Sequence, residues 1–133
     1  MSHRIACVTL LVRDYGEAVR FYTEALRFRV AEDRDMGEGR RWVVVEPGPA
    51  RCRLLLAEAK NEQETAAVGR QAGGRVFLFL HTDDFARDHG EMKARGVRFN
   101  EEPRKEAYGT VAVFEDLYGN KWDLIMPSGA GAG

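Results

Sequence analysis

A pattern of secondary-structure signals that occurs twice constrains this chain of 133 residues more than any other feature. Each half reads as a buried strand, an amphipathic helix and three further strands. An offset of 69 residues carries Asp14 onto Asp83 and Glu46 onto Glu115. Few positions are identical, so the repeat lies in the order of elements, β-α-β-β-β twice. One helix on a four-stranded sheet leaves the other sheet face uncovered, and two such modules side by side can curve these faces around a shared cleft.

In the first half, the β-branched and apolar run IACVTLLV at 5–12 predicts a buried strand. Asp14 and Glu17 have the spacing of a capping box, which predicts a helix start. The helix then follows from apolar residues at helical spacing, namely Ala18, Phe21, Tyr22, Ala25 and Leu26. Further strands are expected at 28–32, 42–46 and 53–57, the first two separated by the polar, glycine-containing stretch 33–41.

In the second half, a helix is expected at 85–95, with Gly96 in the left-handed position that ends it. Its apolar stripe includes His89, which we interpret as a core histidine. Strands are expected at 76–82, 97–100, 111–115 and 121–126. Residues 59–74 form either a flexible connector or a short exposed helix. The predicted fold is α+β, with module one at about 4–59, a connector at 60–74, module two at about 75–127 and a flexible tail at 128–133.

Composition narrows the class of protein. Twenty basic and 21 acidic side chains give a net charge of −1, which offers no general attraction for nucleic acid or an anionic membrane. No apolar run approaches the roughly 20 residues of a membrane helix, and the N-terminus lacks a secretory signal. Cys7 and Cys52 do not form a disulfide framework. We therefore expect a cytoplasmic protein with reduced thiols and with neither nucleic acid nor membrane as partner.

Two long segments resemble a known superfamily. VTLLVRDYGEAVRFYTEALRF at 8–28 resembles the opening signature of the vicinal-oxygen-chelate superfamily, and VAVFEDLYGNKWDLI at 111–125 resembles its closing signature. This superfamily includes glyoxalase I, extradiol dioxygenases, fosfomycin-resistance enzymes and bleomycin-binding proteins. The resemblance covers about residues 4–127 and implies a glyoxalase/bleomycin-resistance-like fold that assembles as a homodimer. Arg27 departs from the family pattern, which usually has glycine at the end of the first helix.

The resemblance also implies where a divalent metal would bind. The four ligand positions fall on Cys7, Leu54, Phe77 (or Val76 if the register slips by one) and Asp123. Leucine and phenylalanine have no donor atom, while a catalytic metal site normally needs three protein ligands. We therefore expect no metal and no other cofactor, with a divalent metal as the alternative. In that alternative, Cys7, His81 and Asp123 form a rearranged site.

Strand alternation predicts what the cleft presents instead of a metal. Cys7 and Thr9 face it from the first strand, and Phe77, Phe79 and His81 face it from the first strand of the second module. Asp123 joins them from the last strand. These residues are the expected ligand-binding set; which face Trp42 occupies is left open. Aromatic faces with a few polar anchors suit a flat or cationic organic ligand.

The function expected from these residues is binding of a small organic molecule, without the family's usual metal, as in bleomycin-resistance proteins. The alternative is a metal-dependent glyoxalase-type lyase or dioxygenase with the rearranged site. A third reading is a metal-free lyase or isomerase with Asp123 or His81 as acid or base. The sequence does not decide whether the protein is catalytic, nor the identity of its ligand or pathway.

Overall fold

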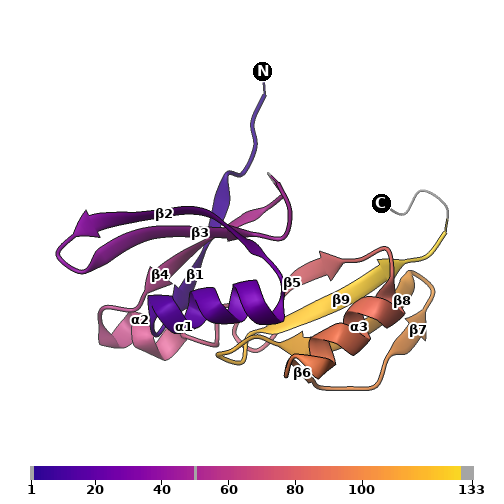
Figure 1. Cartoon of the computed structure of the whole chain (residues 1–133). Coiled ribbons are helices and arrows are strands. Elements are labelled where there is room, and N and C mark those ends of the chain that lie inside the picture. Colours follow the sequence, from indigo (N-terminus) through magenta and orange to yellow (C-terminus); the bar gives the residue numbers. More distant parts are fainter. Residues whose placement is uncertain (1, 50, 130–133) are drawn as a thin grey trace. The chain divides into compact units, whose positions relative to one another are not determined.

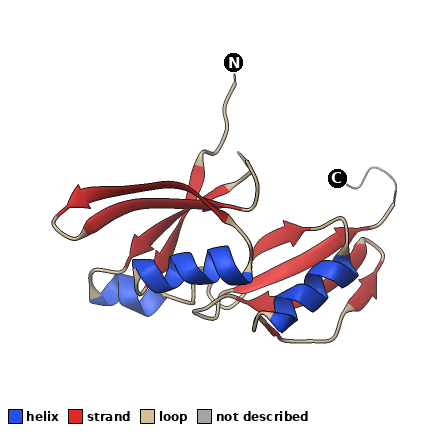
Figure 2. Ribbon diagram, viewed as in Figure 1, coloured by secondary structure: helices blue, strands red, loops and turns tan. Residues whose placement is uncertain are grey.

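The chain forms two mixed sheets, one in each half, as the computed structural model shows (Figures 1 and 2). It describes residues 2–49 and 51–129. The first sheet has the order β1-β4-β3-β2, with strands β1 (Cys7–Val12), β2 (Arg29–Gly37), β3 (Arg40–Glu46) and β4 (Arg53–Glu58). The second has the order β5-β9-β8-β6, with β7 also paired to β8; its strands are β5 (Val76–His81), β6 (Arg98–Phe99), β7 (Arg104–Glu106), β8 (Gly109–Glu115) and β9 (Lys121–Pro127).

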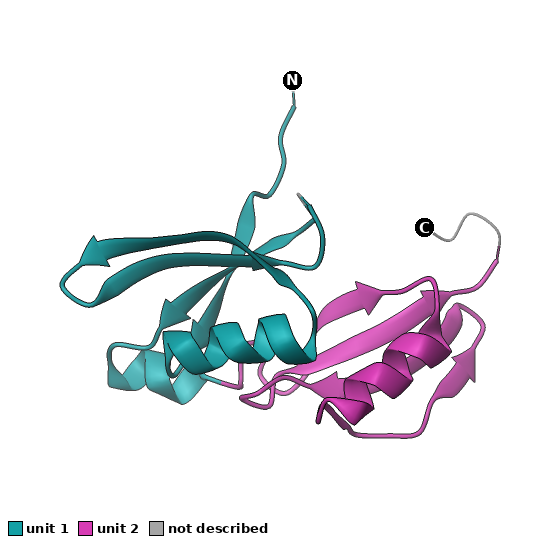
Figure 3. Ribbon diagram, viewed as in Figure 1, with its two compact units in different colours: residues 1–68 teal, residues 69–133 magenta. Residues whose placement is uncertain are grey.

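The chain divides into two compact units, residues 1–68 and 69–133 (Figure 3). In each unit the first strand pairs in parallel with the last, β1 with β4 and β5 with β9, and the remaining pairs are antiparallel. This is the α+β arrangement of two βαβββ modules that the sequence predicts. Among the described residues, no helix is long and apolar enough to cross a membrane.

The helix of unit one begins where the capping residues predict. α1 (Tyr15–Arg20) starts at Asp14, whose Oδ1 accepts a hydrogen bond from the Glu17 amide at 2.9 Å. It continues into a π-helical turn, η1 (Phe21–Ala25). Arg27 then adopts a left-handed conformation with φ 62°. Unit one therefore ends its helix with an arginine in a left-handed conformation, where glycine is the less strained residue.

Alternation along the strands gives each sheet a buried face and an open face. In sheet one, Leu10 and Leu56 are paired and fully buried. Thr9 pairs with Leu55, and Leu55 pairs with Val44 on the opposite face. We call this second face the open face of sheet one, because Thr9 on it is exposed and α1, which contacts β4, packs on the other side.

In sheet two, α3 (Phe85–Ala94) lies along one face and contacts β9 (Figure 2). Leu124 and Phe114 are buried on that face. The opposite face, which carries Phe79, Asp123 and Val113, is called the open face of sheet two.

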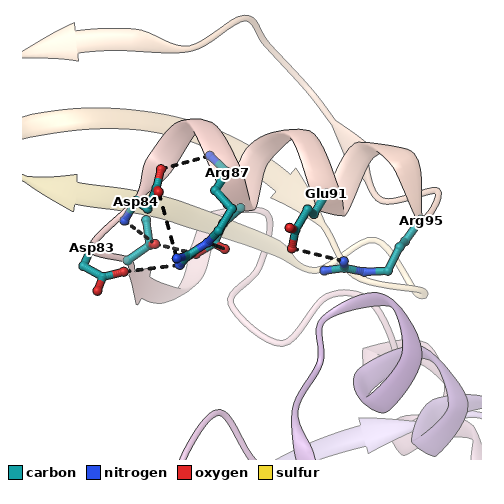
Figure 4. Close-up of polar contacts among 7 residues, drawn as sticks. Asp83, Asp84, Arg87, Glu91 and Arg95 are labelled. Atoms are coloured by element: carbon teal, nitrogen blue, oxygen red, sulfur yellow. Dashed lines mark hydrogen bonds and ion pairs between the residues drawn. The ribbon is translucent and has the colours of Figure 1, made fainter.

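Charged side chains line the exposed side of α3 (Figure 4). Arg87 donates to Asp83 and Asp88, and Arg95 forms an ion pair with Glu91. Asp84 caps the helix by accepting from the Arg87 amide at 3.1 Å. These contacts belong to a solvated helix face and hold its first turn.

The buried stripe of α3 includes Phe85 and Met92, and Gly96 ends the helix with φ 92°. His89 is only half-buried and stacks on Phe85, with ring centroids 5.3 Å apart; it also meets Phe99 edge-on at 4.5 Å. It therefore packs at the border of the core.

The Asp-Leu-Tyr-Gly-Asn segment between β8 and β9 is a turn that closes on itself. Asp116 Oδ1 accepts from the amides of Tyr118 and Asn120, both at 3.0 Å. Asn120 Oδ1 in turn accepts from the Gln71 amide at 3.0 Å. Gly69 packs so closely on this turn that a Cβ would lie 2.0 Å from the Tyr118 carbonyl oxygen. The closing signature therefore fastens the start of unit two to its last hairpin.

The structure differs from the sequence predictions at two points and decides a third that was left open. The stretch 33–41 is not a break between strands, because β2 and β3 run through it as a long hairpin bearing an Asp33–Arg41 ion pair at 2.7 Å. The short strand β7 was missed, because Arg104–Glu106 is wholly polar. Of the two forms left open for 59–74, the helix is present, as α2 (Glu62–Ala67). Residues 130–133 of the expected tail lie outside the described residues.

Candidate functional site: the open faces of the two sheets

Asp123 lies near the middle of the open face of sheet two. It sits on β9, opposite Phe79 on β5 and opposite Val113 on β8. Its neighbours in sequence, Trp122 and Leu124, are buried on the other face, so strand alternation aims the carboxylate away from α3. Only 8% of Asp123 is exposed.

The Asp123 carboxylate is buried without being satisfied. Among the described residues, Oδ1 has no hydrogen-bond partner. Burial raises the pKa of this carboxyl, with Arg104 acting to lower it and Glu101 acting to raise it. Buried carboxylates are normally paired or hydrogen-bonded, so an orphaned oxygen here is a feature that function can explain.

Arg104 is the cation that acts to lower the pKa of Asp123, but its guanidinium is hydrogen-bonded to two other carboxylates. Nε bonds Glu101 Oε1 at 2.8 Å, and the Nη1 group bonds Glu106 Oε2 at 2.5 Å. Glu101 also accepts from the Val113 amide at 3.0 Å, in the gap between β6 and β7. Hydrogen bonding from Arg104 lowers the pKa of Glu101, so this carboxylate stays ionised.

The structure places the predicted aromatic residues of β5 differently from one another. Phe79, opposite Asp123, is 61% exposed, which is unusual for a phenylalanine in a sheet. His81 is exposed opposite Ile125, two residues along the same face. Phe77 is half-buried and falls in a register shift between Val76 and Leu78.

In unit one the structure places Cys7 and Thr9 on the open face of sheet one. Cys7 is half-buried opposite Arg53, and Thr9 is exposed opposite Leu55. Both cysteines of the chain are free thiols. Cys7 and Thr9 therefore lie on the open face of sheet one, and Phe79, His81 and Asp123 lie on the open face of sheet two, whereas Phe77 has no register partner that assigns it to a face.

Sequence reasoning missed a buried ion cluster on the open face of sheet one. Glu46, at the end of β3, is fully buried; its Oε2 lies 2.8 Å from Arg29 Nε and its Oε1 lies 2.8 Å from Arg53 Nε. The repeat carried a signal for it, because Arg29 and Glu46 map at an offset of 69 onto Arg98 and Glu115, which also pair across strands.

Trp42 also belongs to the open face of sheet one, which answers the question that the sequence left open. It alternates with Val43, which pairs with Leu56 on the buried face. The Trp42 indole Nε1 is buried and has no hydrogen-bond partner among the described residues. Trp42 thus carries a buried polar atom without a partner among the described residues, on the open face of sheet one.

The residues at the family's metal positions do not fit a divalent cation. Register corrects one assignment: Leu54 is buried on the helix side, and Leu55 occupies the place in unit one that Asp123 occupies in unit two. Val76 takes the place opposite Lys121 that Cys7 takes opposite Arg53. Neither leucine, valine nor phenylalanine can ligate a metal.

The described part of each unit also lacks a cluster of three or more His, Cys, Asp or Glu side chains placed to hold one ion. Of the residues at the four ligand positions, Asp123 alone has a carboxylate. Its side chain is one methylene shorter than the glutamate that the resemblance implies at this position.

Comparisons with known proteins agree with this fold. The model of the Glyoxalase/Bleomycin resistance protein/Dioxygenase superfamily matches residues 4–124. An uncharacterized protein of Shewanella frigidimarina (strain NCIMB 400) is 50% identical over 95% of each chain. The uncharacterized protein YurT of Bacillus subtilis (strain 168) is 32% identical over 92% of this chain and 98% of its own. The chain belongs to this superfamily.

Two solved structures are similar at the level of the whole chain. UcmS2 is 32% identical, covers 94% of this chain and 98% of its own, and superposes with a TM-score of 0.81. TnmS3, an antibiotic binding protein from Streptomyces sp. CB03234, is 30% identical, covers 96% and 98%, and has a TM-score of 0.78. A binding protein is thus among the solved structures that are similar to this chain in sequence and fold.

Proposed function

We propose that this protein binds a small organic molecule on the open face of sheet two, and that it does so without the divalent metal used by enzymes of its superfamily. The observation that carries the proposal is the exposed ring of Phe79 next to the buried, unsatisfied carboxylate of Asp123. An apolar surface beside a polar anchor is what a ligand site needs. The similarity to the antibiotic-binding TnmS3 supports binding rather than catalysis.

The energetics of such a site are sufficient. Covering an exposed aromatic ring and the matching ligand surface contributes about 25 cal/mol per Å² of apolar area, before the cost of association. His81 and Phe77 on β5 are the further ligand-binding residues of the proposal, while Cys7 and Thr9 of unit one stay predictions from the sequence. Binding without catalysis does not require any residue to change its protonation state.

Calorimetric titration with acridone, a neutral planar aromatic, tests the proposal. Phe79→Ala should weaken binding about tenfold, because stacking on the ring is lost. Leu117→Ala is the matched control, since Leu117 is also an exposed apolar residue of unit two but lies in the β8–β9 turn. The absence of acridone binding, or equal affinity in wild type and Phe79→Ala, would contradict the proposal.

The metal-free state has its own test. Elemental analysis of the dialysed protein should find no stoichiometric Zn, Ni, Mn or Fe, because two of the family's ligand positions lack donor atoms. One ion per chain, lost in Asp123→Ala, would overturn this part and favour the alternative of a metal-dependent lyase or dioxygenase.

A metal-free lyase or isomerase is the second candidate function. The raised pKa of Asp123 favours it, because a carboxyl tuned upward by burial can act as a general acid or base. His81, on the same open face, is the other candidate. In this case Asp123→Asn would abolish turnover of the ligand while leaving its binding measurable.

Assembly and location complete the proposal. Strands β1 and β5 lie at the ends of their sheet orders, and open edges invite pairing with a second chain. Light scattering after size exclusion should give twice the 15.0 kDa of the chain. A cytoplasmic homodimer, with Cys7 and Cys52 reduced, remains the proposed state.

A further inference from the structure

The unsatisfied oxygen of Asp123 defines what the ligand must bring to the open face of sheet two. Oδ1 is buried and has no hydrogen-bond partner among the described residues, and the whole side chain is 8% exposed. A ligand that covers Phe79 removes the remaining water from this carboxylate. Any ligand without a donor at that point would leave an ionised group desolvated, which is strongly unfavourable.

The charges around Asp123 leave a negative site. Arg104 forms ion pairs with Glu101 and Glu106, so with Asp123 three carboxylates face one guanidinium and the local charge is −2. The next group along the face, Lys121 and Arg98 around Glu115, carries one net positive charge, so the negative charge is confined to the surroundings of Asp123. An anionic ligand is therefore disfavoured, and a cation gains both a hydrogen bond and a charge partner.

We infer that the ligand carries a protonated amine next to a planar apolar group, with the amine bound to Asp123 Oδ1 and the apolar group against Phe79. This inference rests on the proposed function and names the ligand class of the same site. A neutral hydroxyl satisfies the hydrogen bond of the oxygen, but only a cation also compensates its buried charge. The aromatic ring of Phe79 also favours a positively charged group next to it.

A matched pair of ligands tests this directly. 2-Naphthylmethylamine and 2-naphthylmethanol have the same ring and nearly the same shape, but only the amine is charged at neutral pH. Binding of each to the full-length protein is followed by NMR chemical-shift titration. Wild type should bind the amine at least about tenfold more tightly than the alcohol, as expected for a hydrogen bond between charged groups.

Two variants distinguish a specific contact with Asp123 from general electrostatic attraction to the negatively charged face. Asp123→Asn should lower affinity for the amine by about tenfold and change that for the alcohol less than about twofold. Glu115→Gln removes one negative charge from the same face of β8 and should leave the preference for the amine intact. Circular dichroism of each variant establishes that it is folded.

The outcomes distinguish this inference from the proposed function. If both ligands bind with equal affinity, or if Asp123→Asn preserves the preference, the amine assignment is wrong while ligand binding stands. If Phe79→Ala abolishes binding of the alcohol, the stacking part of the site holds in either case. If neither ligand binds wild type while acridone does, the amine assignment alone is overturned; if acridone also fails to bind, the proposed function is overturned as well.

Discussion

The two units of this protein share one design and use a buried carboxylate in opposite ways. In unit one, Glu46 is fully buried and forms ion pairs with two arginines, one at each carboxylate oxygen. In unit two, Asp123 is almost as deeply buried, but Oδ1 has no partner among the described residues. A paired buried charge holds a sheet face together, whereas an unpaired one costs stability that a ligand can recover. On the proposed function, the two units therefore divide a structural role and a binding role between them.

Equivalent positions sharpen this contrast. The Arg29–Glu46 pair of unit one recurs as Arg98–Glu115 in unit two, where the contact is 3.8 Å and the Glu115 side chain is 24% exposed. Unit two lacks a second arginine at this point, since Lys121 takes the place of Arg53. The same cross-strand pair is therefore a buried cluster in one unit and a solvated contact in the other.

The largest effect on stability should come from breaking the cluster in unit one. Glu46→Ala leaves two arginines without their carboxylate and should lower the free energy of unfolding by about 2–3 kcal/mol, below the full cost for a dry pair because both arginines reach solvent. Glu115→Ala should cost about 0.5 kcal/mol or less, as for surface ion pairs. Urea denaturation measures both; equal losses would remove the distinction between the units.

The helix ends of the two units offer the next comparison. Arg27 and Gly96 are equivalent, and both have positive φ, 62° and 92°. Arg27→Gly should raise the free energy of unfolding by about 0.5–1 kcal/mol, because glycine relieves the left-handed strain. The gain is reduced because glycine also increases the conformational entropy of the unfolded chain. Gly96→Ala should lower it by about 1 kcal/mol, since the strain comes from the backbone alone and no atom lies within 4 Å of a new Cβ.

Thermal unfolding of both variants checks this prediction. A destabilised Arg27→Gly protein would mean that the Arg27 side chain contributes more than its backbone strain costs.

The prediction for Asp123 is distinguished by its sign rather than by its size. Asp123→Asn should stabilise the unliganded protein by up to about 1 kcal/mol at neutral pH, because it removes a buried charge without a partner. Burial raises the folded-state pKa of Asp123 above its ordinary 3.8. Wild type therefore loses stability as pH rises from the ordinary pKa through the raised one, and the variant does not.

Unfolding curves at several pH values measure this difference. The advantage of Asp123→Asn should vanish at acid pH and grow to its full size above the raised pKa. A variant less stable than wild type at neutral pH would show that the Asp123 carboxylate is satisfied in solution.

The sequence predicted the element order, because apolar periodicity and capping residues such as Asp14 are local signals. It misplaced Leu54 for a physical reason. The loop before β4 spans six residues, 47–52, while the loop before β9 spans five, 116–120, so the repeat offset falls from 69 to 68 at the last strand. A single offset of 69 could not reveal this change at the last strand. It also could not reveal the extra residue at Phe77, which changes the offset along β5 in the opposite direction.

The candidate site was predictable only in part. Alternation from Asp123 places it opposite Phe79, once the two strands are known to pair. The site is unusual because Arg104 is hydrogen-bonded to Glu101 and Glu106 rather than to Asp123. These hydrogen bonds depend on the irregular chain around Pro103. Proline removes a strand hydrogen bond there and splits one strand into β6 and β7, which no periodicity signals.

An NMR titration of the isotope-labelled protein with 2-naphthylmethylamine tests the division of roles between the two units. The largest shifts should fall on the open face of sheet two, at Phe79, Val113 and Asp123, while the amides beside Glu46 stay unchanged. Shifts centred on the Glu46 cluster, with Asp123 unaffected, would contradict the division of roles between the two units.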